Sequence, residues 1–186
     1  MSQPHDFTHV RRSDRAMTDD AWIADFLHRA AVGVLATASD GQPFINSNLF
    51  VYDAATHAIY LHTARTGRTR ANVDAHEQVC FHVFEMGRLL PADTALEFSV
   101  EYGGVTVFGR ARVVEDAEQA RAGLQLLLDK YFAHLRPGEH YRPITNDELV
   151  RTALYRIDIE QWSGKRKAVA EDFPGAFWFG DGRHAN

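Results

Sequence analysis

The residues whose types and spacing are best suited to bind a ligand lie in segment 58–81, between two predicted strands. Thr66 and Gly67 precede Arg68 there, and two further arginines lie nearby. A helix that begins at this point would present unpaired backbone N–H groups, a threonine hydroxyl at its cap and guanidinium groups beside them. Together these groups can hold a phosphate. A solvated basic helix that only joins two strands explains the same pattern, so the local sequence leaves both interpretations open.

A second group of polar residues interrupts the predicted strand 44–52. Asn46, Ser47 and Asn48 follow one another there, so amides and a hydroxyl point to both faces of the strand. A ligand at the strand edge would explain this run, and so would a bulge or a solvent-exposed edge.

The composition is that of an ordinary globular protein. Its 186 residues, 45% of them hydrophobic, suit one domain. The net charge of −5 argues against a nucleic-acid partner. Cys80 is the only cysteine, which excludes an internal disulfide and a cysteine-based zinc site. Its neighbours Val79 and Phe81 predict a small buried side chain rather than a reactive thiol.

The sequence contains no apolar run near the roughly 20 residues that a membrane-spanning helix needs. The first 15 residues are polar and lack the apolar core of a signal peptide. We therefore expect a cytoplasmic protein with no membrane partner.

The residue periodicity predicts a mainly β fold with added helices (α+β), an antiparallel barrel in a single domain, 1–186. Residues 1–17 are predicted to form an N-terminal arm, and 168–186 a C-terminal tail whose aromatic part packs on the domain or on a second subunit. Ser39-Asp40-Gly41 is typical of a hairpin turn. The expected strands, about six or seven, are 32–37, 44–52, 58–62, 79–83, 96–102, 105–114 and 152–159, with 85–95 as a loop and Gly103-Gly104 as a joint or bulge.

Three or four helices are predicted outside the sheet. Thr18 is expected to cap the first, whose buried face comprises residues at helical spacing: Trp22, Ile23, Phe26, Leu27 and Ala30. Asp116 with Gln119 and Thr145 with Glu148 match the capping-box pattern and mark the starts of two more helices.

This order of parts resembles the flavin-binding split-barrel family typified by pyridoxamine 5′-phosphate oxidase, and within it the branch of nitroimidazole-reductase-like proteins. The resemblance covers residues 10–168. The matching segments are Asp40-Gly41-Gln42-Pro43, Tyr60-Leu61-His62-Thr63-Ala64 with Gly67-Arg68, Val79-Cys80-Phe81, residues 105–111, and Ile159-Glu160-Gln161-Trp162-Ser163-Gly164-Lys165.

The resemblance implies a split β-barrel and a homodimer with FMN at the subunit interface. Carried over position by position, it implies three groups of cofactor-binding residues. Asn46, Ser47, Asn48 and Leu49 would border the isoalloxazine ring and ribityl chain, with His62, Thr63 and Ala64 on the neighbouring strand. Gly67, Arg68 and Thr69 would hold the phosphate, and Trp162 and Lys165 would come from the partner subunit.

The sequence departs from the family pattern in two places. No Lys or Arg occurs from Asp40 to Ala64, where vitamin B6 oxidases carry basic residues, and Gly104 stands where the family usually has a polar side chain. Both departures argue against a B6-phosphate substrate and remain compatible with FMN. No metal site is predicted, because His5 and His9 lie in an arm without periodic structure.

The implied activity is that of an FMN-dependent oxidoreductase. It would pass hydride or electrons from a reduced nicotinamide to a small acceptor such as a nitroaromatic or a quinone. Because the flavin carries this chemistry, the sequence assigns no catalytic residue. The alternatives are a non-catalytic flavin- or haem-binding protein and a deazaflavin-dependent reductase of the same fold. His62 is either a hydrogen-bond donor at the site or an ordinary barrel histidine.

Overall fold

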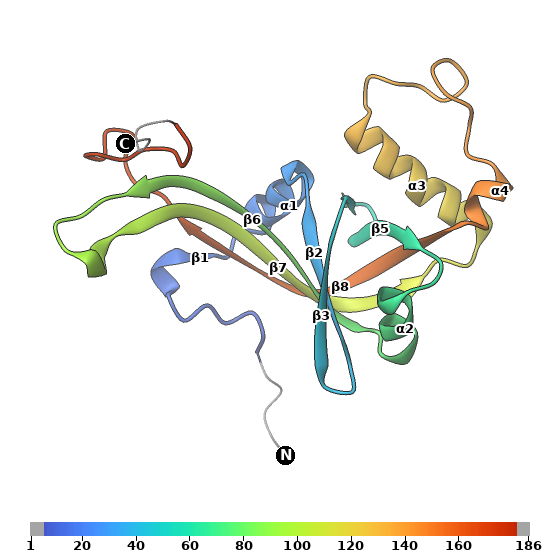
Figure 1. Cartoon of the computed structure of the whole chain (residues 1–186), viewed down its shortest axis with the longest axis horizontal. Helices are drawn as coiled ribbons and strands as arrows, with labels where there is room; N and C mark the ends of the chain where they lie inside the picture. Colours follow the sequence, from blue (N-terminus) through green and yellow to red (C-terminus); the bar gives the residue numbers. More distant parts are fainter. Residues whose placement is uncertain (1–5, 182–186) are drawn as a thin grey trace.

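The computed structural model describes residues 6–181 and contains one antiparallel sheet of eight strands (Figure 1). Seven of them follow one another in the order β3-β2-β6-β7-β8-β5-β4, and β1 pairs with the end of β8. The fold is therefore α+β, with one strand more than the upper expectation. The strands are β1 (Ala16–Met17), β2 (Gly33–Ser39), β3 (Gln42–Asn48), β4 (Phe50–Asp53), β5 (Ala58–Ala64), β6 (Gln78–Leu90), β7 (Ser99–Val113) and β8 (Thr152–Lys167).

The predicted hairpin between β2 and β3 is confirmed. Asp40 and Gly41 both have positive φ, 51° and 76°, which matches the twist of a two-residue hairpin turn. The strand predicted as 44–52, however, is two strands. It bends at Leu49, so that β3 pairs with β2 whereas β4 pairs with β5. No Gly or Pro occurs in residues 44–52 to mark the break, which explains why the sequence pattern did not separate the two strands.

The predicted loop 85–95 is wrong at its start, because β6 continues to Leu90 and pairs with β7 almost throughout. The expected joint at Gly103-Gly104 is also absent, since β7 runs unbroken from Ser99 to Val113. The register shifts fall instead between Met86 and Leu89 and between Phe108 and Gly109. Cross-strand pairing thus overrides the weak strand propensity of these glycines.

The described residues form four α-helices around the sheet: α1 (Asp20–Arg29), α2 (Arg68–Ala75), α3 (Ala117–Tyr131) and α4 (Asn146–Leu149). The cap of α1 is Asp19, not Thr18, because the Asp19 carboxylate accepts from the N–H of Ala21 at 2.9 Å. The Asp116 cap of α3 and the Thr145–Glu148 capping box of α4 are confirmed. No helix among the described residues is long and apolar enough to cross a membrane.

The core has two parts. The larger one lies inside the barrel under α1, where Ile23, Phe26 and Leu27 pack with strand residues such as Phe81. Trp22, expected on the same face, is only partly buried. The smaller part lies between α3 and the opposite face of β4, β5 and β8.

The tail packs on the domain. Phe177 exchanges backbone hydrogen bonds with Leu89 of β6, at 2.7 and 3.2 Å. Figure 1 shows the tail above the long β6–β7 hairpin, at the end of the molecule opposite α3 and α4. Residues 182–186 of the predicted tail and 1–5 of the predicted arm, His5 among them, lie outside the described residues.

Candidate functional site

The barrel is split where β3 and β4 part. Phe50 and Leu61 form the last residue pair between β4 and β5. Beyond this pair β3 stays with β2, whereas β5 continues beside β8 as far as Ala64. Residues 46–49 and 62–64 therefore border one opening, and α2 begins four residues after β5 ends. The three predicted groups that lie in this part of the chain thus meet around the split.

The N-terminus of α2 has the features of an anion site. Its cap is Gly67, with φ 135°, and no side chain bonds to the first N–H groups. The prediction of a hydroxyl side chain at the cap is therefore wrong, because Thr66 lies one residue before the cap. A glycine adopts this backbone conformation readily, whereas other residues rarely do. The first turn of α2 is left with free donors for a ligand.

Arg68 lies at this helix start with its guanidinium 5.4 Å from the centre of the Phe44 ring. Within residues 6–181 it makes no ion pair with a carboxylate. A cavity of about 630 Å³ adjoins it, lined also by Ser39, Gln42 and Asn72. Phe44 was not predicted as a site residue, although period-two alternation puts it on the same face of β3 as Asn46.

The three polar residues of β3 divide between its faces. Asn48 is buried and donates to the backbone oxygen of Asn46 at 2.8 Å, and the two side chains meet at 3.2 Å. Ser47 points to the other face, because it pairs with Val34 in the row outside the buried Leu35. Leu49, at the bend, is 45% exposed.

On the opposite border of the split, His62 and Ala64 are exposed at the end of β5, and the Thr63 hydroxyl donates to the Ala64 backbone oxygen at 3.0 Å. Thr69 is buried, so its backbone N–H rather than its side chain is placed for a ligand. Beneath it the Asn72 amide donates to the hydroxyl of Thr37 at 2.8 Å, which fixes α2 on β2.

Trp162 and Lys165 lie elsewhere, toward the far end of β8. The Trp162 indole N–H donates to the carboxylate of Asp20 at 2.8 Å, and its ring packs edge-on against His57. Lys165 pairs with Gly104 of β7, and its side chain lies on the face of β8 opposite to that of Trp162. One chain alone therefore does not bring either residue to its own split, and their predicted contact with a partner subunit's cofactor stays a prediction.

The outer face of β2, β3 and β6 carries no helix in the described part of the chain. Apart from His82 its side chains are mostly small or apolar, and Ile45 and Phe84 are 66% and 67% exposed. Cys80 lies on the same face, half-buried, and burial raises the pKa of its thiol. This uncovered apolar surface is the kind of face that a second protein surface covers.

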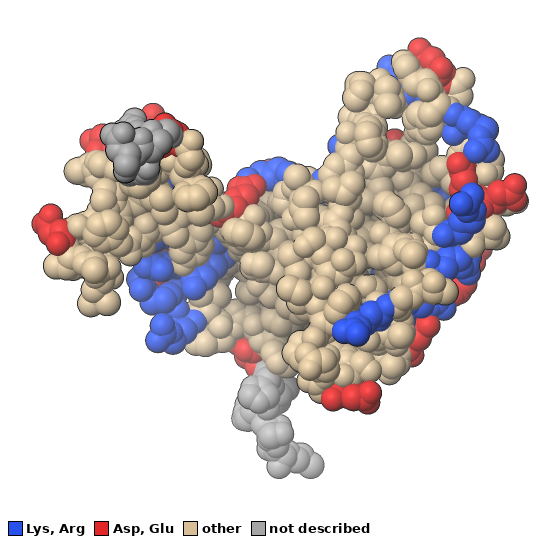
Figure 2. Space-filling model, in the orientation of Figure 1, with Lys and Arg blue, Asp and Glu red and all other residues tan. Residues whose placement is uncertain are grey.

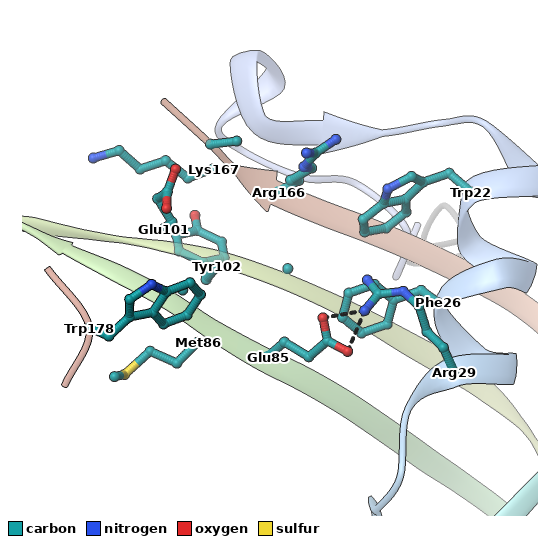
Figure 3. Close-up of a pocket in the computed structure, with 13 residues that line it drawn as sticks. Trp22, Phe26, Arg29, Glu85, Met86, Glu101, Tyr102, Arg166, Lys167 and Trp178 are labelled. Carbon is teal, nitrogen blue, oxygen red and sulfur yellow. Dashed lines mark hydrogen bonds and ion pairs between the residues drawn. The ribbon is translucent and has the colours of Figure 1, made fainter. Parts of the chain in front are cut away.

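A further hollow of about 330 Å³ lies between α1, the β6–β7 hairpin and the tail (Figure 3). Trp22 from α1 and Trp178 from the tail stand at opposite ends of it. Arg29 and Glu85 are paired across its wall, and Glu101 is paired with Arg88. Because most of these charges are already matched, this hollow is less suited than the split to an anionic ligand.

The part of the chain that the structure describes contains no group of three or more His, Cys, Asp or Glu side chains that could hold a metal ion.

An antiparallel split barrel with an uncapped helix start beside its opening defines a class of protein, and comparison with known proteins places the chain within it. The family model for pyridoxamine 5′-phosphate oxidase matches residues 19–166. The chain therefore belongs to the pyridoxamine 5′-phosphate oxidase family. A search of curated proteins finds no match.

Several solved structures share the fold. The flavocytochrome Anf3 from Azotobacter vinelandii is 25% identical, with a TM-score of 0.78 over 89% of this chain and 76% of that one. A candidate 5-nitroimidazole antibiotic resistance protein from Bacteroides thetaiotaomicron is 17% identical, with a TM-score of 0.67 over 81% and 86% of the two chains. An FAD- and haem-binding protein from Mycobacterium smegmatis is 20% identical, with a TM-score of 0.73 over 83% and 74%.

Proposed function

We propose that this protein binds FMN in the split of the barrel and passes hydride or electrons from a reduced nicotinamide to a small acceptor. The observation that carries the proposal is the meeting of three polar segments at one opening, beside an uncapped helix start with an unpaired arginine. The family supports a flavin, and the names of the Azotobacter and Mycobacterium proteins point to flavins as well.

The phosphate of FMN fits the start of α2. The free N–H groups of the first turn and the Arg68 guanidinium supply hydrogen bonds and positive charge at one point. The remaining borders, Asn46 to Leu49 and His62 to Ala64, would then face the ribityl chain and the ring system. The two linked asparagines present amide groups that can pair with the polar edge of a flavin.

A homodimer is part of the proposal. The outer face of β2, β3 and β6 is apolar and uncovered, and a second copy of the chain would bury it. Trp162 and Lys165 lie far from the split of their own chain, so in a dimer they would serve the partner's cofactor, as the family resemblance implies.

The flavin, when bound, supplies the redox chemistry. The chain's own residues bind and orient it, keep water from the ring and leave room for donor and acceptor. Ser47 and Ala64 are small residues at the borders of the split and would leave one face of the ring accessible. His62, exposed beside them, would orient a ligand by a hydrogen bond without carrying electrons.

Pyridoxamine 5′-phosphate is not the proposed substrate, although it names the family. A dianionic substrate needs cations near its phosphate. Neither border strand of the split carries a Lys or Arg, since none occurs from Asp40 to Ala64. A nitroaromatic or quinone acceptor has no such requirement.

The purified protein tests the proposal directly. We expect it to carry FMN, identified by absorbance and mass, and to be bleached anaerobically by NADH or NADPH. A nitroaromatic or quinone should restore the colour, and His62→Asn should slow this cycle modestly while keeping the flavin. A colourless protein that does not bind added FMN would contradict the proposal.

A second candidate is a flavin- or haem-binding protein without turnover, and the names of the Azotobacter and Mycobacterium proteins favour it. If neither nicotinamide bleaches the flavin while dithionite does, this candidate or a deazaflavin-dependent reductase becomes the better account. A Soret band in the purified protein would identify haem.

A further inference from the structure

A cavity of about 480 Å³ lies on the outer face of the sheet, between the N-terminal arm and strands β6, β7 and β8. His9 and Arg11 of the arm form one wall, and the ring of Phe7 packs 5.2 Å from that of Phe108 nearby. Ser47, at the split, lies in the same outer row as His82 of the cavity, two strands away or about 10 Å. The cavity is therefore separate from the split but on the same face.

The charged side chains that line this cavity are all basic. Arg11 and Lys165 line it, and its lining includes no Asp or Glu. Within residues 6–181 neither cation has an ion pair with a carboxylate, and Lys165 lies 5.7 Å from the centre of the Tyr102 ring. Figure 2 shows basic side chains gathered over β1 and the neighbouring strand ends, in a protein whose net charge is −5. Such a cavity attracts an anion.

Tyr102 adds a directed donor. Arg15 donates to its hydroxyl oxygen at 3.2 Å, which leaves the phenolic hydrogen free for an acceptor in the cavity. Burial raises the pKa of Tyr102, but the hydrogen bonds and positive charges of Arg15 and Lys165 outweigh it and lower the pKa overall. A more acidic phenol donates a stronger hydrogen bond to an anion.

The rest of the lining suits a flat ring. Phe84 is 67% exposed and stacks nearly parallel to His82, with the ring planes at 11°. Gly104 leaves the strand backbone bare beside them, since a Cβ there would lie 3.4 Å from the His82 ring and 3.6 Å from the Phe84 Cβ. Burial lowers the pKa of His82, so its ring is neutral at pH 7 and stacks as an uncharged group.

We infer that this cavity binds a planar aromatic carboxylate, with its charge at Lys165 and Arg11 and its ring against Phe84 over the bare glycine backbone. The inference rests on the proposed function, since it names the class of acceptor that would reach the flavin of a partner subunit. It gives Lys165 a different role from the one in the family resemblance and in the proposed dimer, since both assign this residue to the partner's cofactor.

The test uses three small probes with the purified full chain, with its flavin bound and without it: benzoate, benzamide and cyclohexanecarboxylate. Ligand-observed NMR measures binding without turnover. We expect benzoate to bind about tenfold more tightly than uncharged benzamide, because it keeps charge-assisted hydrogen bonds. It should also exceed cyclohexanecarboxylate, which has the charge without the aromatic ring. Equal affinities for benzoate and benzamide would overturn the inference, as would no binding of benzoate at all.

Two variants and one control locate the site. Lys165→Gln should weaken benzoate several-fold to tenfold and leave benzamide unchanged, whereas Phe84→Leu should weaken both. Arg166→Gln removes the same charge one residue further along β8, where the side chain lines the other hollow, and should leave benzoate binding as it was. If Arg166→Gln weakens benzoate binding as much as Lys165→Gln does, the effect comes from the overall charge of the protein and the inference fails.

The cofactor assignment of Lys165 has a distinct outcome. If Lys165→Gln weakens FMN but not benzoate, the residue serves the flavin and the inference is wrong. The proposed function fails separately, through a flavin that is absent or that nicotinamides cannot reduce, and neither result depends on the benzoate titration.

Discussion

The Tyr131 hydroxyl lies 2.9 Å from both the backbone nitrogen and the backbone oxygen of Phe50, the first residue after the bend that splits the barrel. It also lies 2.7 Å from the backbone oxygen of Ala31. Burial raises the pKa of Tyr131, so the hydroxyl stays protonated and can donate to either oxygen. The Tyr131 side chain of α3 thus fixes the backbone at the position where β3 and β4 separate.

Tyr131→Phe should therefore destabilise the protein and loosen the split. The N–H of Phe50 loses its acceptor, which costs about 1–3 kcal/mol for a buried group. We expect urea unfolding to show this loss in free energy and FMN affinity to fall with it. Tyr141→Phe is the control, because its hydroxyl is also part-buried but accepts from the Gln125 side chain of α3, away from the bend. Equal losses in both variants would contradict a special role for the bend.

Arg68→Ala should weaken FMN binding by about 1.5–3 kcal/mol, the range for hydrogen bonds to a charged group. Riboflavin has no phosphate and should lose much less. Arg70→Ala, in the same helix turn but paired with Asp74 at 2.6 Å, is the matched control. Titration of the flavin-free native protein and of both variants with FMN and with riboflavin measures these affinities. Equal weakening of both flavins by Arg68→Ala would show that this residue acts on folding or on the ring.

Ile45→Lys should dissociate the proposed homodimer, because it puts a charge on the uncovered apolar face. Val150→Lys makes the same change at an apolar residue just after α4, which has nearly equal exposure, 63% against 66%, and lies away from that face. Sedimentation equilibrium should find a dimer for the native chain and for Val150→Lys, and a monomer for Ile45→Lys. A native chain that sediments as a strict monomer would refute the dimer.

The pH dependence of stability should report the pairing of Arg88 and Glu101. The Arg88 side chain binds the Glu101 carboxylate in a two-pronged pair, at 2.7 and 3.0 Å, and the N–H of Val169 donates to the same group at 2.9 Å. These contacts, the Arg88 hydrogen bonds first, lower the pKa of Glu101 to about 2.

Because the folded pKa of Glu101 lies below its ordinary value of 4.5, its contribution is complete above pH 4.5 and disappears as the pH falls toward 2. Glu101→Gln should be less stable at neutral pH and should lose less stability than the native chain over that acid range. Glu97→Gln, with an exposed side chain nearby, is the control. Urea unfolding at several pH values provides the comparison, and parallel pH curves for Glu101→Gln and the native chain would rule this account out.

Much of the architecture was predictable from local signals. The Asp40-Gly41 turn and the capping pairs at Asp116 and Thr145 were predicted at the residues where they occur. These features depend on a few neighbouring residues, so the amino-acid sequence contains the whole cause. The local sequence of segment 66–70 predicted a phosphate site, and it was equally compatible with a plain connecting helix.

Only the tertiary structure decided where those segments go. No Gly or Pro marks the bend at Leu49, yet it separates β3 from β4 and opens the split. The extension of β6 through Gly87 depends on pairing with β7, in pairs that run from Phe84 with Gly104 to Leu90 with Ser99. Likewise Trp162 and Lys165, three residues apart, lie on opposite faces of β8 and meet different neighbours. Such outcomes depend on which distant backbone supplies the hydrogen-bond partners, and a local residue pattern does not contain that information.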